Sequence, residues 1–132
     1  MHTPRNVFLL SILFIFAGAM HFVISSRYMG IMPPWIPYQL EMVYITGVAE
    51  MAGGIGLLFP ALRRAAGIGL ILLLVAVFPA NVQMLSNAIH GGSSALYIAL
   101  LVLRLPLQPL LIVLVYRASI AAAVSRTVRT SL

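Results

Sequence analysis

The chain has 132 residues, of which 62% are hydrophobic and only 8% are charged. A soluble domain of this length must cover a large surface with polar residues, and this composition cannot supply them, so we expect an integral membrane protein. The absence of cysteine excludes disulfides, thiol relays and cysteine-ligated metals, and the net charge of +6 comes from arginines that we expect to mark helix ends rather than a nucleic-acid site.

Four apolar segments are long enough to cross a bilayer as helices, because one span needs about 20 residues. The first follows Arg5 and contains the small residues Ala17–Ala19, as a signal peptide does, but its apolar sequence continues to span length. We therefore expect one all-α membrane domain, residues 1–132, folded as a four-helix transmembrane bundle. The expected spans are residues 7–25, 42–60, 65–88 and 95–116.

The segment 25–39, between the first and second spans, is rich in proline and aromatic residues. Proline lacks a backbone donor and interrupts helices, so we expect a structured Pro-rich loop rather than one continuous helix. Tyr28, Trp35 and Tyr38 suit the headgroup region, because tyrosine and tryptophan concentrate at membrane interfaces.

The positions of the arginines predict the orientation of the bundle. Only Arg27 falls on the side of the Pro-rich loop. The other loop and tail arginines fall on the opposite side: Arg5, Arg63, Arg64, Arg117, Arg126 and Arg129. Because positively charged loops stay in the cytoplasm, we expect cytoplasmic N- and C-termini and an outward-facing Pro-rich loop. The protein would then be a multi-pass protein of the inner (plasma) membrane.

Each expected span carries a polar residue in its outer half. Glu50 and Arg104 both lie about nine residues from the outer ends of their spans, which corresponds to roughly 13 Å of helix. We predict that they pair, because an opposite charge at matching depth offsets much of the cost of burying each group. His21 and Asn81 belong to the first and third spans, and Gln108 lies one turn from Arg104.

Small residues share the helix faces of two of these polar groups. Gly47 and Gly54 lie within four residues of Glu50, and Gly18 lies three residues before His21. Small residues let helices approach closely in lipid, so these faces are expected to meet. A polar cluster between helices can serve only to hold them together, or it can form a ligand site beneath the outer loop. We predict a ligand site.

Haem and copper have weaker support in the sequence. His21 and His90 fall on the same side of the membrane, but their spacing matches no haem motif. Several methionines lie in the expected outer half and thioethers bind Cu(I), yet methionine is also an ordinary apolar residue. We therefore expect no metal site and neither of these cofactors.

Four motifs, in order along the chain, resemble those of the DoxX-like family of small membrane proteins. They are His21-Phe22 with Tyr28, Pro33, Pro34 and Pro37; Gly47–Glu50 with Gly53–Leu58 and Arg63-Arg64; Val77–Asn81; and Arg104–Gln108. The resemblance covers roughly residues 14–111. It implies a four-helix membrane bundle that brings these motifs together. The family takes its name from a subunit of a thiosulfate:quinone oxidoreductase, and other relatives are described as membrane redox partners or assembly factors.

Our leading hypothesis is a small redox-linked membrane subunit with a site for a lipid-soluble ligand, and the candidate cofactor is a quinone. Glu50 and His21 would be the catalytic residues, since a carboxylate and an imidazole can exchange protons with a bound ligand. The ligand-binding residues would be His21, Asn81, Arg104, Gln108, Tyr28 and Trp35. Another membrane or redox protein would supply the electrons.

Two other functions stay open at this point. A small-solute transporter would use Glu50 for coupling, although small multidrug transporters carry their glutamate in the first span rather than the second. A membrane chaperone or assembly factor would use the apolar exterior and the Pro-rich loop to contact its partner. Whether the protein is an enzyme, and how many copies assemble, stay open as well.

Overall fold

The structure is a computed structural model that describes residues 4–30, 32 and 34–130, and this part of the chain contains helices and no strand. Four of its helices are long and apolar enough to cross a membrane. They are α1 (Arg5–Val23), α3 (Gln39–Leu58), α4 (Arg63–His90) and the continuous helix Ala95–Ala121, which consists of α5 (Ala95–Tyr116) and a π-helical segment (Arg117–Ala121). The expected all-α, four-span architecture is thus confirmed.

Two shorter helices complete the chain. α2 (Ser25–Gly30) occupies the first part of the predicted Pro-rich loop, and Pro33 of that loop lies outside the described residues. α6 (Ala122–Thr130) continues the last span, where the sequence predicted a tail beyond Tyr116. Alanines at 118 and 121–123 favour this extension, because alanine has the highest helix propensity.

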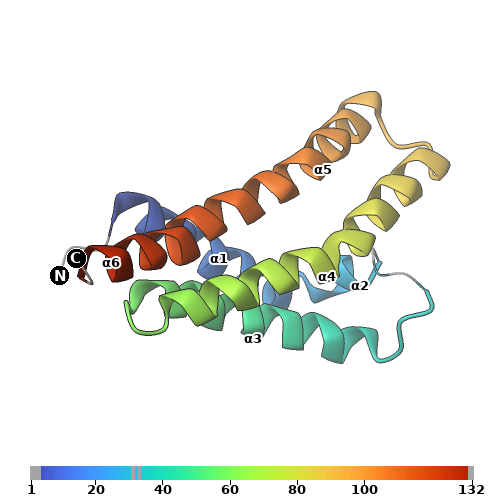
Figure 1. The fold of residues 1–132 in the computed structure, drawn as a ribbon. Helices are drawn as coiled ribbons and strands as arrows, with labels where there is room; N and C mark the ends of the chain where they lie inside the picture. The colour runs from blue at the N-terminus through green and yellow to red at the C-terminus, as the bar shows by residue number, and fades with distance from the viewer. Residues whose placement is uncertain (1–3, 31, 33, 131–132) are drawn as a thin grey trace.

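The helices form two packed pairs, α1 with α3 and α4 with α5, and the pairs meet along α3 and α4. α1 packs along α3, α4 packs on both α3 and α5, and Figure 1 shows α5 rising away from α3 toward one end of the bundle. That end, the loop end, holds α2 and the connection between α4 and α5. The opposite end, the terminal end, holds the start of α1, the α3–α4 turn and α6. The pairs therefore separate toward the loop end.

Glycines bring the backbones of α1 and α3 into direct contact. A Cβ atom on Gly47 would lie 2.7 Å from His21 Cβ and 3.0 Å from the carbonyl oxygen of Gly18. A Cβ atom on Gly54 would lie 2.9 Å from the carbonyl oxygen of Ser11. Separations this short leave no space for a side chain, so the predicted small-residue contact between the two spans is confirmed.

Arg63, at the start of α4, binds the carbonyl end of α3. Its Nε donates to the carbonyl oxygen of Leu57 at 2.7 Å, and its Nη2 donates to that of Leu58 at 3.5 Å. The residue is buried, with 6% of its surface exposed. These carbonyls have no partner within their own helix, so the guanidinium both satisfies them and fixes the α3–α4 turn.

Replacing Arg63 with methionine should therefore lower the free energy of unfolding by about 1.5–3 kcal/mol, the usual range for a hydrogen bond from a charged group. Thermal unfolding in mild detergent measures the change. Arg64→Met is the matched control, because Arg64 is exposed on the same turn. Equal losses in the two variants would contradict the capping role of Arg63.

Candidate functional site

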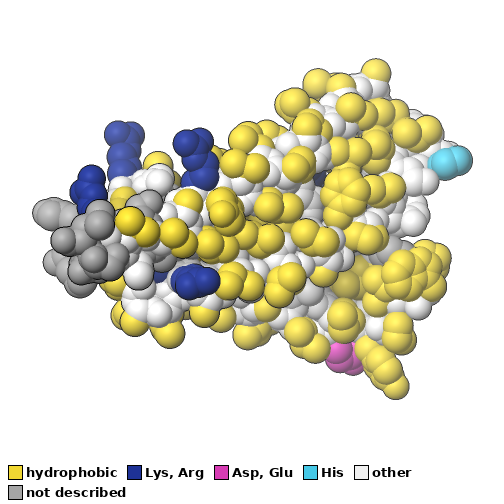
Figure 2. Space-filling view, in the orientation of Figure 1, with side chains coloured by type: hydrophobic (Ala, Val, Ile, Leu, Met, Phe, Trp, Pro, Cys, Tyr) yellow, Lys and Arg dark blue, Asp and Glu magenta, His cyan; other side chains and the backbone are white. Residues whose placement is uncertain are grey.

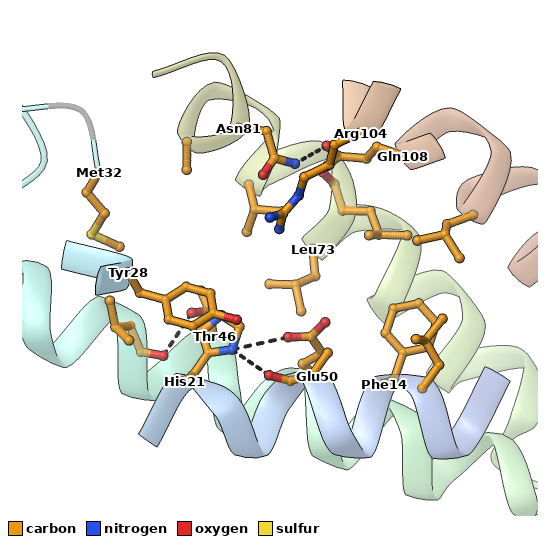
Figure 3. A pocket seen from close by; sticks show the side chains of 17 residues that line it. Phe14, His21, Tyr28, Met32, Thr46, Glu50, Leu73, Asn81, Arg104 and Gln108 are labelled. Carbon is orange, nitrogen blue, oxygen red and sulfur yellow. Dashed lines mark hydrogen bonds and ion pairs between the residues drawn. The ribbon is translucent and has the colours of Figure 1, made fainter. Parts of the chain in front are cut away.

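A cavity of about 230 Å³ lies where the two helix pairs separate. All four spanning helices and α2 contribute to its walls (Figure 3). Most of the lining is apolar, and it includes Phe14 from α1, Leu73 and Leu74 from α4, and Leu111 from α5. Its polar side chains form two groups on opposite sides, which we call the His21 side and the Arg104 side (Figure 3).

The His21 side consists of His21, Tyr28, Thr46 and Glu50. Nδ1 of His21 lies 3.0 Å from the carbonyl oxygen of Ala17 and 3.5 Å from Oε2 of Glu50. The ring of Tyr28 stacks on the imidazole, with 4.0 Å between the ring centroids. Burial raises the pKa of the Tyr28 phenol, and the Glu50 carboxylate raises this pKa further. Tyr28 therefore covers His21 as a neutral, hydrogen-bonding ring.

The close contact of α1 with α3 sets the geometry of this side. His21 and Glu50 lie one turn beyond Gly18 and Gly47, respectively, on the faces where the two helices touch. Both side chains are largely enclosed, with 11% of His21 and 15% of Glu50 exposed. The glycine contact thus holds an imidazole and a carboxylate together inside the bundle.

The Arg104 side consists of Asn81, Arg104 and Gln108. Nδ2 of Asn81 donates to Oε1 of Gln108, and Nε2 of Gln108 donates to the carbonyl oxygen of Leu74. This network joins α4 to α5 through a buried glutamine. Arg104 takes no part in it, and its Nη1 lies 3.9 Å from the thioether sulfur of Met84. A thioether is a weak acceptor, so the guanidinium has little bonding within the protein.

The predicted pair of Glu50 with Arg104 is not formed. The one acid–base contact within 4.0 Å in the described part of the chain joins His21 to Glu50. Glu50 and Arg104 instead lie on opposite sides of the cavity (Figure 3). The reason is the order of packing: α5 packs against α4, and α3 packs against α1 and α4. Two residues at equal depth in different spans are therefore not necessarily neighbours.

The cavity includes five of the six predicted ligand-binding residues. The exception is Trp35, which does not line the cavity and is 74% exposed. His90, considered with His21 for haem, also lies outside the lining and is exposed, and its Nδ1 lies 2.8 Å from the carbonyl oxygen of Ser86. No group of three or more His, Asp or Glu that could hold a metal ion occurs among the residues that the structure describes.

Thr46 is a polar lining residue that the sequence reasoning missed. Its hydroxyl donates to the carbonyl oxygens of Met42 and Val43, both at 2.9 Å, so its oxygen lone pairs are left for other donors. Val43, Thr46 and Glu50 follow the spacing of one helix face, and this periodicity would have placed Thr46 beside Glu50.

One known family model matches this chain, over residues 10–119, and its description is a domain of unknown function, DUF8561. No curated protein and no solved structure matches the chain. The matched residues include every polar side chain that lines the cavity, from His21 to Gln108. The chain therefore belongs to the DUF8561 family.

Proposed function

We propose that this protein is a small redox-linked subunit of the inner (plasma) membrane that binds a quinone in the cavity between its helix pairs. The observation that carries the proposal is the cavity itself, which has apolar walls and polar groups on two opposite sides. A quinone has the same pattern, because its apolar ring carries an oxygen on each of two opposite edges. Sites for small ligands are typically mostly apolar, with a few convergent polar groups.

The two sides suit two different tasks. On the Arg104 side, the guanidinium and the amide groups of Asn81 and Gln108 would hold one ligand oxygen. On the His21 side, Glu50 and His21 would exchange a proton with the other oxygen, since both groups titrate and lie within 3.5 Å of each other. An ionisable group inside a membrane span costs free energy to bury, so its presence there favours a functional role.

The surface charge supports the proposed orientation. The arginines on the face seen in Figure 2 gather toward the terminal end, and apolar side chains cover most of the remaining length. Exposed arginines of this end are Arg5, Arg64, Arg117 and Arg129, whereas the side chain of Arg126 lies outside the described part. The positive-inside rule would then put the terminal end in the cytoplasm and the cavity toward the outer surface.

The motifs that resemble DoxX-like proteins favour the same proposal. They contain His21, Glu50, Asn81, Arg104 and Gln108, and the cavity is lined by all five. A partner membrane or redox protein would provide the electrons that a bound quinone takes up. If no quinone binds, the alternative functions are a solute transporter and an assembly factor.

The experiment is a titration of the detergent-solubilised protein with a short-chain benzoquinone, in the native sequence and in Arg104→Leu. We expect saturable binding, and we expect Arg104→Leu to weaken it by about tenfold to a hundredfold, because a hydrogen bond from a charged group contributes roughly 1.5–3 kcal/mol. The variant should unfold at nearly the native temperature, because Arg104 is exposed and its side-chain hydrogen bond among the described residues is to a thioether.

Arg64→Leu is the control for loss of a positive charge, since Arg64 is exposed and lies outside the cavity. Absence of saturable binding would refute the quinone site. A strongly destabilised Arg104→Leu protein would show instead that the arginine is a structural residue.

A further inference from the structure

The hydrogen on the His21 ring can be assigned from its surroundings. Nδ1 lies 3.0 Å from the carbonyl oxygen of Ala17, and a carbonyl oxygen only accepts hydrogen bonds. Nδ1 must therefore carry the hydrogen. A neutral imidazole with its hydrogen on Nδ1 has a lone pair on Nε2, so Nε2 is an acceptor. The mostly apolar lining around the ring favours this uncharged form.

Nε2 of His21 is available to a ligand. The structure gives Nε2 no hydrogen bond, although every fully enclosed side-chain nitrogen or oxygen of the described residues has a partner. Nε2 is therefore not fully enclosed, and His21 lines the cavity. The His21 side thus presents an acceptor, Nε2, to a ligand.

On the Arg104 side, the guanidinium presents donors instead. A guanidinium has five N–H donors and no acceptor, and the thioether of Met84 is a weak partner for them. The chain has two acidic residues in all, Glu41 and Glu50. Glu41 is exposed in the first turn of α3, and Glu50 contacts His21, so neither neutralises Arg104 by contact. Arg104 is exposed, so its donors are available to an acceptor on a ligand.

We infer that the site binds the hydroquinone more tightly than the quinone. This inference rests on the proposed function and adds the redox form of its ligand. A hydroquinone can donate one O–H to Nε2 of His21 while its other oxygen accepts from Arg104. A quinone has two oxygens that only accept, so one of them faces the lone pair of Nε2. The Tyr28 hydroxyl can donate or accept, and it therefore does not discriminate between the two forms.

The test compares the affinities of a short-chain benzoquinone and its hydroquinone for the full-length protein in detergent, under anaerobic conditions. We expect the hydroquinone to bind about tenfold more tightly, as one additional hydrogen bond allows. His21→Phe keeps a ring that can stack on Tyr28 and removes the acceptor. It should weaken hydroquinone binding about tenfold and so abolish the preference for the hydroquinone. His90→Phe is the matched control and should retain the native preference, because His90 lies outside the cavity.

The outcomes separate this inference from the proposed function. Equal affinities, or tighter quinone binding, would overturn the inference and leave the quinone site standing. Binding of neither compound would overturn both. A preference that persists in His21→Phe would overturn the role of Nε2. The comparison in the native protein decides the preference even if His21→Phe fails to fold.

Discussion

Replacement of Gly47 by valine should lower the free energy of unfolding by about 3 kcal/mol, at the upper end of the usual range for overpacking a well-packed interior. The first added carbon atom would lie 2.7 Å from Cβ of His21 and 3.0 Å from the carbonyl oxygen of Gly18. Relief requires α1 to move away from α3, which also separates His21 from Glu50. Thermal unfolding in mild detergent measures the loss of stability.

Gly69→Val is the matched control for Gly47→Val. It is the same substitution within a spanning helix, but a Cβ atom on Gly69 meets no atom within 4 Å. Its effect should be confined to the small difference in helix propensity between glycine and valine. If the two variants lost the same stability, the backbone contact of α1 with α3 would not be what holds this pair together.

Replacement of Ala80 by phenylalanine should abolish quinone binding without unfolding the protein. Ala80 lines the cavity from α4, so a benzyl group at this position can occupy the space of the ligand ring. The cavity already exists, and filling it adds apolar contacts rather than strain, so the unfolding temperature should stay the same or rise. A titration with short-chain benzoquinone measures the loss, which we expect to exceed a hundredfold, about 2.7 kcal/mol.

Ala99→Phe is the matched control for Ala80→Phe. Ala99 is exposed on α5 and does not line the cavity, so the added ring would face lipid or detergent. Quinone affinity should then equal that of the native protein. Native affinity in Ala80→Phe would mean that any quinone binds elsewhere on the molecule.

Much of the fold could be predicted from the sequence because the bilayer restricts what a chain can do. Backbone groups in lipid must be satisfied internally, so an apolar run of about 20 residues becomes a helix. The structure confirms this for the four spans, although α4 begins at Arg63 and ends at His90, slightly beyond the predicted limits. The helical continuation after Tyr116 was not predicted. The apolar run that marks a span ends at the charged Arg117, but the alanine-rich sequence that follows still favours a helix.

The residues that line the candidate site were easier to predict than the side chains with which each of them pairs. Depth along the helices selected His21, Glu50, Asn81, Arg104 and Gln108, and the structure places all of them around one cavity. The predicted pairing failed because depth does not specify which helices are neighbours.

Trp35 shows a second limit of the sequence reasoning. The sequence analysis placed it at the headgroup level and also among the ligand-binding residues, but the residue lies in the segment between α2 and α3 and is 74% exposed. An aromatic residue near a membrane surface serves equally well as an interfacial anchor. The neighbouring Tyr28 differs only because α2 turns it back onto His21. Tertiary packing, rather than residue type, separates these two roles.

The quinone content of the protein purified from its own membranes shows whether this cavity holds a quinone. Native protein and Ala80→Phe would be purified in parallel in mild detergent, extracted into organic solvent and analysed by mass spectrometry. We predict about one quinone or hydroquinone per native chain and only the detergent background in Ala80→Phe. Equal amounts in the two preparations, or none in the native protein, would contradict a quinone site in this cavity.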